Sequence, residues 1–376
     1  MKEFSLTLKE KVRQLDMVML FCAMTLSILS VVTLASSADA YKAGMAYARN
    51  QVFAMVLGLL CVGIISMVDY DMLIERLEYI FFGVSVALLL LVIFFGEGEM
   101  GNENWISIPI INMNIQPTEF VKITFMITFS RHLDRVKHKI NHPLSVLQLL
   151  IHGGIIIGMV VLSGDDGMAL VYAVIFAVML FCAGISLWYV AGAMALVVIL
   201  FPVLWDHMAL YQQQRILVGF NPDLDPDYIG YQSIKSRDCI ISGGFRGAGF
   251  SGGSKYYVLP AGQSDCLFSV LAEKFGFIGT FTYIALITIL IWRIILLAKN
   301  CRKTYASFLC MGMVGMLLAQ TLENIGMCLA IMPVVGITLP FFSYGGSSML
   351  SMYICLGVLQ SICSHNHKYY FEREQE

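Results

Sequence analysis

Long apolar segments separated by short polar ones extend over almost the whole chain. A helix that crosses a bilayer needs about 20 mostly apolar residues, and about ten segments approach that length. We therefore expect an all-α, polytopic membrane protein with about ten transmembrane helices. The predicted spans are 17–36, 51–68, 77–96, 118–132, 144–162, 168–183, 187–204, 267–292, 305–330 and 345–363.

The polar connections between these spans differ greatly in length. The segment at about 205–266 is far longer than the others and is rich in Gly, Pro, Asp and Tyr. A loop of this length is usually functional or disordered, and its many aromatic residues favour an ordered cap. No Pro-rich or Ser-rich linker interrupts the chain. Residues 1–376 are therefore predicted to form a single membrane domain with one large extracytoplasmic loop.

Charge sets the expected orientation and excludes one class of partner. Basic residues precede the first span, and no small-residue cleavage site follows it, so we expect a retained helix and not a signal peptide. An even number of spans puts both termini on one side, and a cytoplasmic placement of that side puts most Lys and Arg residues inside, as the positive-inside rule requires. The formal net charge of -2 argues against binding to nucleic acid, which needs a basic surface. The basic residues before the first span are Lys2, Lys9, Lys11 and Arg13.

Two charged residues fall near the outer end of the fourth span. Glu119 and Lys122 follow Gln116 and Pro117, and their spacing of three places them on one helix face within pairing distance. A buried ion pair can be purely structural. Lys122 can also bind a diphosphate, and the two roles are compatible.

Asp265 stands at the mouth of the eighth span. A carboxyl at the edge of an apolar cavity has a raised pKa and becomes a usable general base near neutral pH. Asp is also a favoured helix N-cap, which is the alternative interpretation. Glu273 and Lys274 follow within the same span, where an ion pair between them or with another helix is expected.

The Gly-rich run 242–253 contains a formal G-x-G-x-x-G pattern. No buried strand precedes it and no amphipathic helix follows, so the context of a dinucleotide site is missing. The glycines instead favour tight turns and close backbone approach, for example to a phosphate. Cys239 and Cys266 both fall on the predicted outer side, which leaves a disulfide between them open.

A series of short motifs runs in order from the first span to the last. They are Trp105, Ile115-Gln116-Pro117-Thr118-Glu119-Phe120-Val121-Lys122, Gln214-Arg215-Ile216-Leu217, Ser264-Asp265, Asn324-Ile325-Gly326-Met327 and Leu339-Pro340-Phe341-Phe342-Ser343-Tyr344-Gly345-Gly346-Ser347-Ser348. Together they resemble the SEDS family, which includes RodA, FtsW and SpoVE, with RodA slightly favoured. The resemblance covers nearly the whole chain.

This resemblance implies a peptidoglycan glycosyltransferase of the bacterial cytoplasmic membrane. Such an enzyme polymerises the membrane-bound precursor lipid II and works with a class B penicillin-binding protein that crosslinks the product. The family's invariant loop carboxylate corresponds to Asp265, which becomes the expected catalytic base. The predicted substrate-binding residues are Trp105, Gln116, Glu119, Lys122, Arg215, Glu273, Ser343, Gly345, Gly346 and Ser347.

Two motifs depart from the family pattern. Where the family usually has Gln-Pro-Asp-x-Gly, this chain has Ser163-Gly164-Asp165-Asp166-Gly167, and where it usually has His-Thr-Asp, this chain has Gln263-Ser264-Asp265. The carboxylates are retained in both motifs. The histidine next to the expected base is absent, so no role can be given to it here.

The expected chemistry is one displacement with inversion, which gives a β-1,4 bond. It needs a base at the attacking hydroxyl and positive charge at the departing diphosphate. We assign the base to Asp265 and the charge to Arg215 and Lys122, with a divalent cation, Mg²⁺ or Mn²⁺, as a candidate cofactor whose ligands stay unassigned. No organic cofactor is expected. The alternatives are a lipid II flippase, because ionisable groups inside spans also mark transporters, and a non-catalytic scaffold of the elongation or division machinery.

Overall fold

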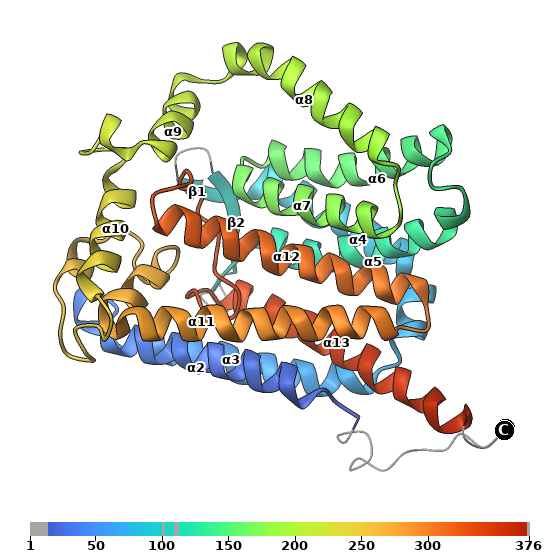
Figure 1. The fold of residues 1–376 in the computed structure, drawn as a ribbon, viewed down its shortest axis with the longest axis horizontal. Coiled ribbons are helices and arrows are strands. Elements are labelled where there is room, and N and C mark those ends of the chain that lie inside the picture. The colour runs from blue at the N-terminus through green and yellow to red at the C-terminus, as the bar shows by residue number, and fades with distance from the viewer. Residues whose placement is uncertain (1–13, 100–101, 109–112, 374–376) are drawn as a thin grey trace.

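Long helices occupy all ten segments that were predicted to be spans (Figure 1). The computed structural model describes residues 14–99, 102–108 and 113–373, so the basic residues 2–13 lie outside the described part. The helices are α2 (Met17–Ser36), α3 (Ala46–Met67), α4 (Tyr70–Phe95), α5 (Pro117–Val136), α6 (Pro143–Leu162), α7 (Asp166–Cys182), α8 (Leu187–His207), α11 (Leu267–Asn300), α12 (Thr304–Cys328) and α13 (Gly346–Arg373).

Seven helices in the described part of the chain are long and apolar enough to cross a membrane. They are α2, α3, α6, α11, α12 and the greater parts of α4 and α13. The apolar stretches of α7 and α8 are shorter. Helix α5 is less apolar because it carries Glu119 and Lys122 in its first two turns and basic residues near its end. The predicted polytopic helical fold is thereby confirmed.

Local capping signals explain where several helices begin. The Asp16 side chain accepts hydrogen bonds from the backbone N–H groups of Val18 and Met19 at the start of α2. Asp165 caps α7 in the same manner. Helices α5 and α6 each begin with a proline, whose missing N–H costs nothing at this position. These signals depend only on neighbouring residues, so most predicted starts agree with the structure.

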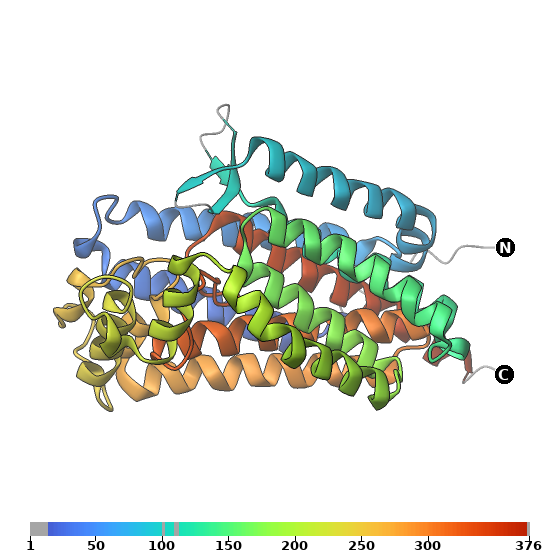
Figure 2. The same ribbon diagram turned by 90° about the horizontal axis from the view of Figure 1, so that it is seen from above.

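Both termini lie at one end of the bundle, and the long predicted loop lies at the other (Figure 2). This loop is ordered, as expected, but it contains helices that its weak periodicity did not predict. They are α9 (Leu210–Phe220), η3 (Pro222–Leu224), α10 (Tyr231–Gly243) and η4 (Lys255–Val258). Two further single turns are η1 (Ala38–Ala40) and η2 (Lys137–Lys139).

A small antiparallel sheet is the exception to the all-α prediction. It is formed by β1 (Glu97–Glu99), β2 (Asn102–Ile108) and β3 (Met113–Ile115), in the order β1-β2-β3. The sheet joins α4 to α5 at the end of the bundle remote from the termini. Its strands are too short for a clear alternating pattern to be recognised beside the long apolar helices.

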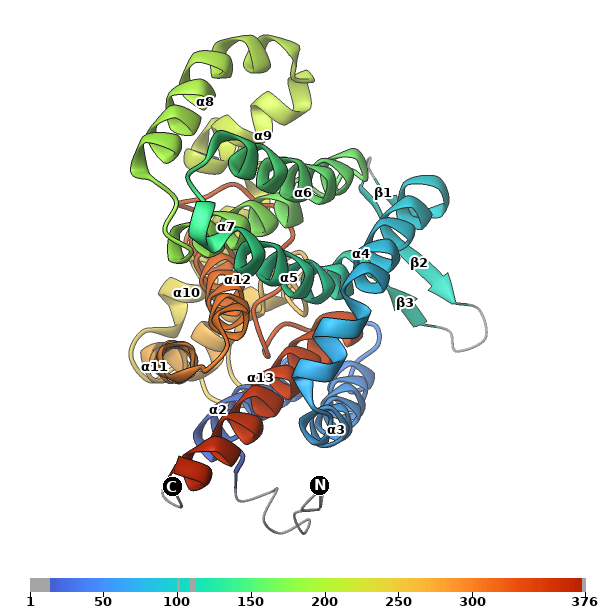
Figure 3. The ribbon, with the colours of Figure 1, turned by 90° about the vertical axis from the view of Figure 1, so that its right-hand side faces the viewer.

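Close helix packing holds the centre of the bundle together, whereas α8 stands apart. A Cβ at Gly312 of α12 would lie 2.8 Å from the sulfur of Met179 of α7, and one at Gly58 of α3 would lie 2.6 Å from the Tyr353 ring of α13, so only glycine allows these approaches. Helix α8 arches away from the other helices (Figures 1 and 3). Its side chains are exposed along most of its length. In a membrane, this surface contacts lipid.

Candidate functional site

The segment between α12 and α13 connects the parts of the site. The Arg215 Nε of α9 donates a hydrogen bond to the Val334 carbonyl oxygen at 2.8 Å. The Tyr344 N–H donates to the Gln263 carbonyl oxygen at 3.2 Å. Residues 333–348 therefore contact both α9 of the outer loop and the residues that precede α11, and they lead directly into α13.

Asp265 lies against this segment, immediately before α11. Asn324 Nδ2 of α12 donates to the Asp265 carbonyl oxygen at 2.8 Å and to the Ile337 carbonyl oxygen at 2.6 Å. A Cβ at Gly336 would lie 3.6 Å from Asp265 Oδ2. Burial raises the pKa of the Asp265 carboxyl to about 6, although a hydrogen bond from Ser264 opposes the shift. A carboxyl with this pKa is largely ionised at neutral pH and can accept a proton.

The structure does not support the capping interpretation of Asp265. Helix α11 begins at Leu267, and its N-cap residue is Cys266. The Asp265 carboxyl therefore does not cap α11, and it can accept a proton at the end of the bundle that carries the outer loop.

Glu119 and Lys122 form the predicted ion pair on α5. Lys122 Nζ lies 2.8 Å from Glu119 Oε2, and both side chains are fully buried. The Ser351 hydroxyl of α13 donates to the same Glu119 oxygen at 2.8 Å. Glu119 Oε1 is buried without a hydrogen-bond partner in the described part of the structure. The pair thus retains acceptor capacity that the protein itself does not use.

A second polar group lies between α5, α7 and α13. Asp165 Oδ2 accepts a hydrogen bond from Gln116 Nε2 at 3.0 Å, while Oδ1 caps α7 through the Met168 N–H. The Gln116 N–H donates to the Ser347 hydroxyl at 3.2 Å. Burial raises the pKa of Asp165 to about 6. In the sequence, Asp165 stands out only as part of an altered motif. Its position after Gly164 and directly before α7 is the sequence feature that could have indicated a capping residue at a helix start.

Ser343 and Gly345 belong to the turn that leads into α13, and Gly346 is the first residue of that helix. Gln51 of α3 donates to the Ser343 carbonyl oxygen at 3.0 Å and accepts from the Gly345 N–H at 3.5 Å. The Ser343 hydroxyl accepts a hydrogen bond from the Leu339 N–H at 2.9 Å. These contacts shape the turn, so any contact of these residues with a substrate stays a prediction.

Glu273 and Lys274 bind the outer loop and do not pair with each other as expected. The Glu273 carboxylate accepts hydrogen bonds from three successive backbone N–H groups, those of residues 254–256, each at 2.8 Å. Lys274 Nζ donates to the Gly252 carbonyl oxygen at 2.8 Å and lies 3.9 Å from the centre of the Tyr256 ring. Both charges therefore hold the Gly-rich run and η4 against α11.

The glycines of this run allow the close approach that the sequence suggested. A Cβ at Gly243 would lie 1.9 Å from the Ala272 carbonyl oxygen. Gly247 has a φ of 77°, and a Cβ there would lie 2.3 Å from the Lys274 carbonyl oxygen. The approach is to α11, where Gly276 has non-helical backbone angles. Contact with a phosphate stays a prediction.

The remaining predicted residues lie at the edge of the site. Trp105 belongs to β2 and is 37% exposed. Arg215 is exposed, and only its Nε has a hydrogen-bond partner in the described part of the chain. Both Cys239 and Cys266 are free, so the disulfide that the sequence left open is absent from the structure.

Comparison with known proteins decides the family. The family model for cell cycle proteins of the FtsW, RodA and SpoVE type matches residues 13–368. The chain belongs to the FtsW/RodA/SpoVE family. Because seven helices among its described residues are suited to crossing a membrane, this family member is a multi-pass membrane protein.

Individual members of the FtsW/RodA/SpoVE family are similar over most of the chain. The probable peptidoglycan glycosyltransferase FtsW of Trichlorobacter lovleyi is 31% identical, covering 94% of this chain and 94% of its own. The peptidoglycan glycosyltransferase MrdB of Escherichia coli K12 is 31% identical over 75% of this chain and 76% of its own.

Solved structures agree with the fold of this family member. A chain from a peptidoglycan synthase complex, studied for the coordination of polymerization and crosslinking, has a TM-score of 0.82 at 27% identity and covers 94% of this chain and 99% of that chain. The rod shape determining protein RodA of Thermus thermophilus has a TM-score of 0.70 at 25% identity, with 94% and 98% covered.

Proposed function

We propose that this FtsW/RodA/SpoVE family member is a peptidoglycan glycosyltransferase that polymerises lipid II. The observation that carries the proposal is the position of Asp265. Its carboxyl, with a pKa raised to about 6 by burial, lies beside Gly336, two residues from the Val334 carbonyl that binds Arg215. A candidate base, Asp265, and a cation, Arg215, thus both lie against the short segment 334–336.

The reaction follows from these two groups. Asp265 takes the proton from the 4-hydroxyl of the lipid II GlcNAc as that oxygen attacks the anomeric carbon of the donor glycan. The bond from this carbon to the diphosphate oxygen breaks, and the diphosphate leaves with the electron pair. The configuration inverts and a β-1,4 bond results, with no covalent enzyme intermediate.

Positive charge at the leaving diphosphate comes first from Arg215. Its Nε is held by Val334, which leaves the two Nη nitrogens to face phosphate oxygens. Lys122 adds charge from a buried position, where Glu119 fixes its Nζ. Mg²⁺ or Mn²⁺ would be held by the oxygens of the substrate diphosphate, since the described residues contain no group of three His, Cys, Asp or Glu side chains suited to a metal.

The membrane arrangement fits a substrate that carries a prenyl tail. Helix α8 stands away from the other helices and exposes apolar side chains such as Val198 and Ile199. A tail can therefore lie beside α8 while the diphosphate reaches Arg215 on α9. We place both termini in the cytoplasm and the site on the outer face of the cytoplasmic membrane, with a class B penicillin-binding protein as the partner that crosslinks the glycan.

Polymerisation by the purified protein in detergent tests this proposal. Wild type should convert labelled lipid II into glycan chains, and Asp265→Ala should abolish the product. A flippase would form no polymer, because moving intact lipid II across a bilayer forms no glycosidic bond. Asp227→Ala, at an exposed position of the outer loop, is the matched control and should remain active. Equal polymer yield from Asp265→Ala and Asp227→Ala would refute the assignment.

A further inference from the structure

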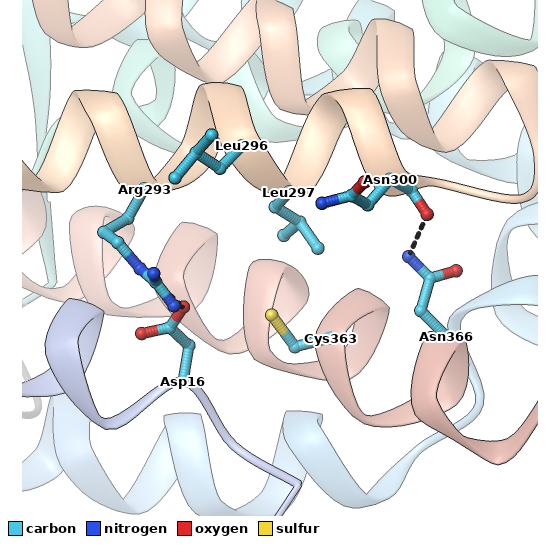
Figure 4. Close-up of a pocket in the computed structure, with 7 residues that line it drawn as sticks. All are labelled: Asp16, Arg293, Leu296, Leu297, Asn300, Cys363 and Asn366. Atoms are coloured by element: carbon cyan, nitrogen blue, oxygen red, sulfur yellow. Dashed lines mark hydrogen bonds and ion pairs between the residues drawn. The ribbon is translucent and has the colours of Figure 1, made fainter. Parts of the chain in front are cut away.

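A cavity of about 330 Å³ is lined by Asp16 and by the last parts of α11 and α13 (Figure 4). Both termini lie at this end of the bundle (Figure 2). One wall is the last part of α11, with Arg293, Leu297 and Asn300. The opposite wall is formed by Cys363 and Asn366 of α13. Its volume lies in the range of pockets that hold small ligands or lipid head groups, roughly 300–1,000 Å³.

The α11 wall is amphipathic along its length. Leu296 and Leu297 lie three and four positions after Arg293, and Asn300 follows seven positions after it. These spacings place the four residues on one face of the helix. The cavity therefore has a guanidinium group at one end and carboxamides at the other, separated by an apolar middle.

Asp16, the one acidic side chain among the described residues that line the cavity, forms an ion pair with Arg293. Asp16 Oδ1 accepts hydrogen bonds from the first N–H groups of α2. Asp16 Oδ2 binds Arg293 Nε at 3.0 Å and Nη2 at 2.5 Å. The Arg293 Nη1 nitrogen then has no partner in the described part of the chain, so it can still donate to an anion.

Carboxamides line the other end of the cavity. Asn366 Nδ2 donates to the backbone oxygen of Asn300 at 3.3 Å, as Figure 4 shows. This bond leaves the Asn300 side-chain amide without a partner among the described residues. An amide of this kind can donate to and accept from a hydroxyl group.

We propose that this cavity binds the head group of an anionic, hydroxylated phospholipid of the phosphatidylglycerol type. The phosphate meets Arg293 Nη1, the glycerol hydroxyls meet the Asn300 amide, and the acyl chains pass Leu296 into the bilayer. Basic pockets between helices at a membrane surface are suited to such head groups. The apolar middle of the cavity and its place at the helix ends favour a lipid over a soluble anion.

Retention of lipid by the full-length protein tests the site. The purified chain is incubated in detergent with equal amounts of phosphatidylglycerol and phosphatidylcholine of the same acyl chains, and bound lipid is measured by native mass spectrometry. Wild type should prefer phosphatidylglycerol about fivefold, because one basic residue near a lipid surface contributes about 1 kcal/mol. The double variant Asp16→Asn with Arg293→Gln should lose this preference. Asparagine at position 16 still caps α2.

A second variant and a matched control complete the experiment. Leu297→Trp fills the cavity without changing its charge and should also remove the preference for phosphatidylglycerol. This variant tests the site even if the double variant does not fold. Lys299→Gln removes a charge from an exposed position of the same helix end and should retain lipid like wild type. Equal retention of both lipids by wild type, or the same loss in Lys299→Gln, overturns the proposal. Displacement of the lipid by millimolar glycerol phosphate also overturns it, since that would indicate a site for soluble anions.

Discussion

Asn324 and Asp265 are joined through one side-chain nitrogen. Asn324 Nδ2 donates to the Asp265 carbonyl oxygen and also to that of Ile337. The residue that precedes α11 and the segment that precedes α13 are thereby held at a fixed separation. Because Asp265 Oδ2 lies near Gly336, this separation also sets the space in which the expected base can work.

Removing the Asn324 amide should lower polymerisation more than it lowers lipid II binding. Asn324→Ala leaves two carbonyl groups without their donor, at a cost of about 1–3 kcal/mol for each buried group. The base then loses its position while Arg215 is unaffected. Turnover and the lipid II dissociation constant should be measured together. Asp227→Ala, at an exposed site, is the control, and an equal loss in both variants would contradict this role.

The pair of Glu119 and Lys122 can be tested by a double substitution. Lys122→Ala should be severe, because breaking a buried pair typically costs about 3–5 kcal/mol. Glu119→Gln with Lys122→Met should restore thermal stability, since an apolar replacement of a buried pair is often tolerated. Polymerisation should stay low because the charge at the diphosphate is missing. Near wild-type polymerisation by the double variant would make the pair purely structural and leave Arg215 as the main phosphate contact.

Polymerisation should fall as the pH is lowered from 7 to 5. The Asp265 pKa is raised to about 6, so the ionised form that accepts a proton predominates above this pH and is lost below it. For one such group, the active fraction falls about tenfold over this range. Initial rates should be measured in wild type and in Asp165→Asn, because Asp165 also has a pKa of about 6. A pH profile that becomes flat in Asp165→Asn would assign the acid limb to Asp165.

Gly336→Ala should impair catalysis beyond its effect on stability. Gly336 has a φ of 71°, where an alanine costs about 1–2 kcal/mol, and its new methyl group would contact the Asp265 carboxylate. Gly184→Ala is the matched control, because Gly184 has a φ of 86° but open space around it. Both variants should lose similar thermal stability, and only Gly336→Ala should lose turnover. The same turnover in both would show that the carboxylate tolerates the methyl group.

The sequence alone was sufficient for features that depend on neighbouring residues. The bounds of α2 match the predicted span 17–36, because an apolar run and the Asp16 cap define the helix locally. The Glu119–Lys122 pair also followed from helical spacing. By contrast, α9 and α10 were missed, since their short helices carry a weak apolar pattern within a polar loop.

Tertiary structure alone decided how distant segments meet. Asn324 and Asp265 are 59 residues apart, and Arg215 binds a carbonyl 119 residues away. Glu273, expected to form an ion pair, instead accepts hydrogen bonds from three backbone N–H groups of the outer loop. Its contact with substrate stays a prediction. Apolar length and helical period depend only on nearby residues, so a sequence displays them directly. Hydrogen bonds between remote segments depend on how the helices pack, and only the folded chain determines that.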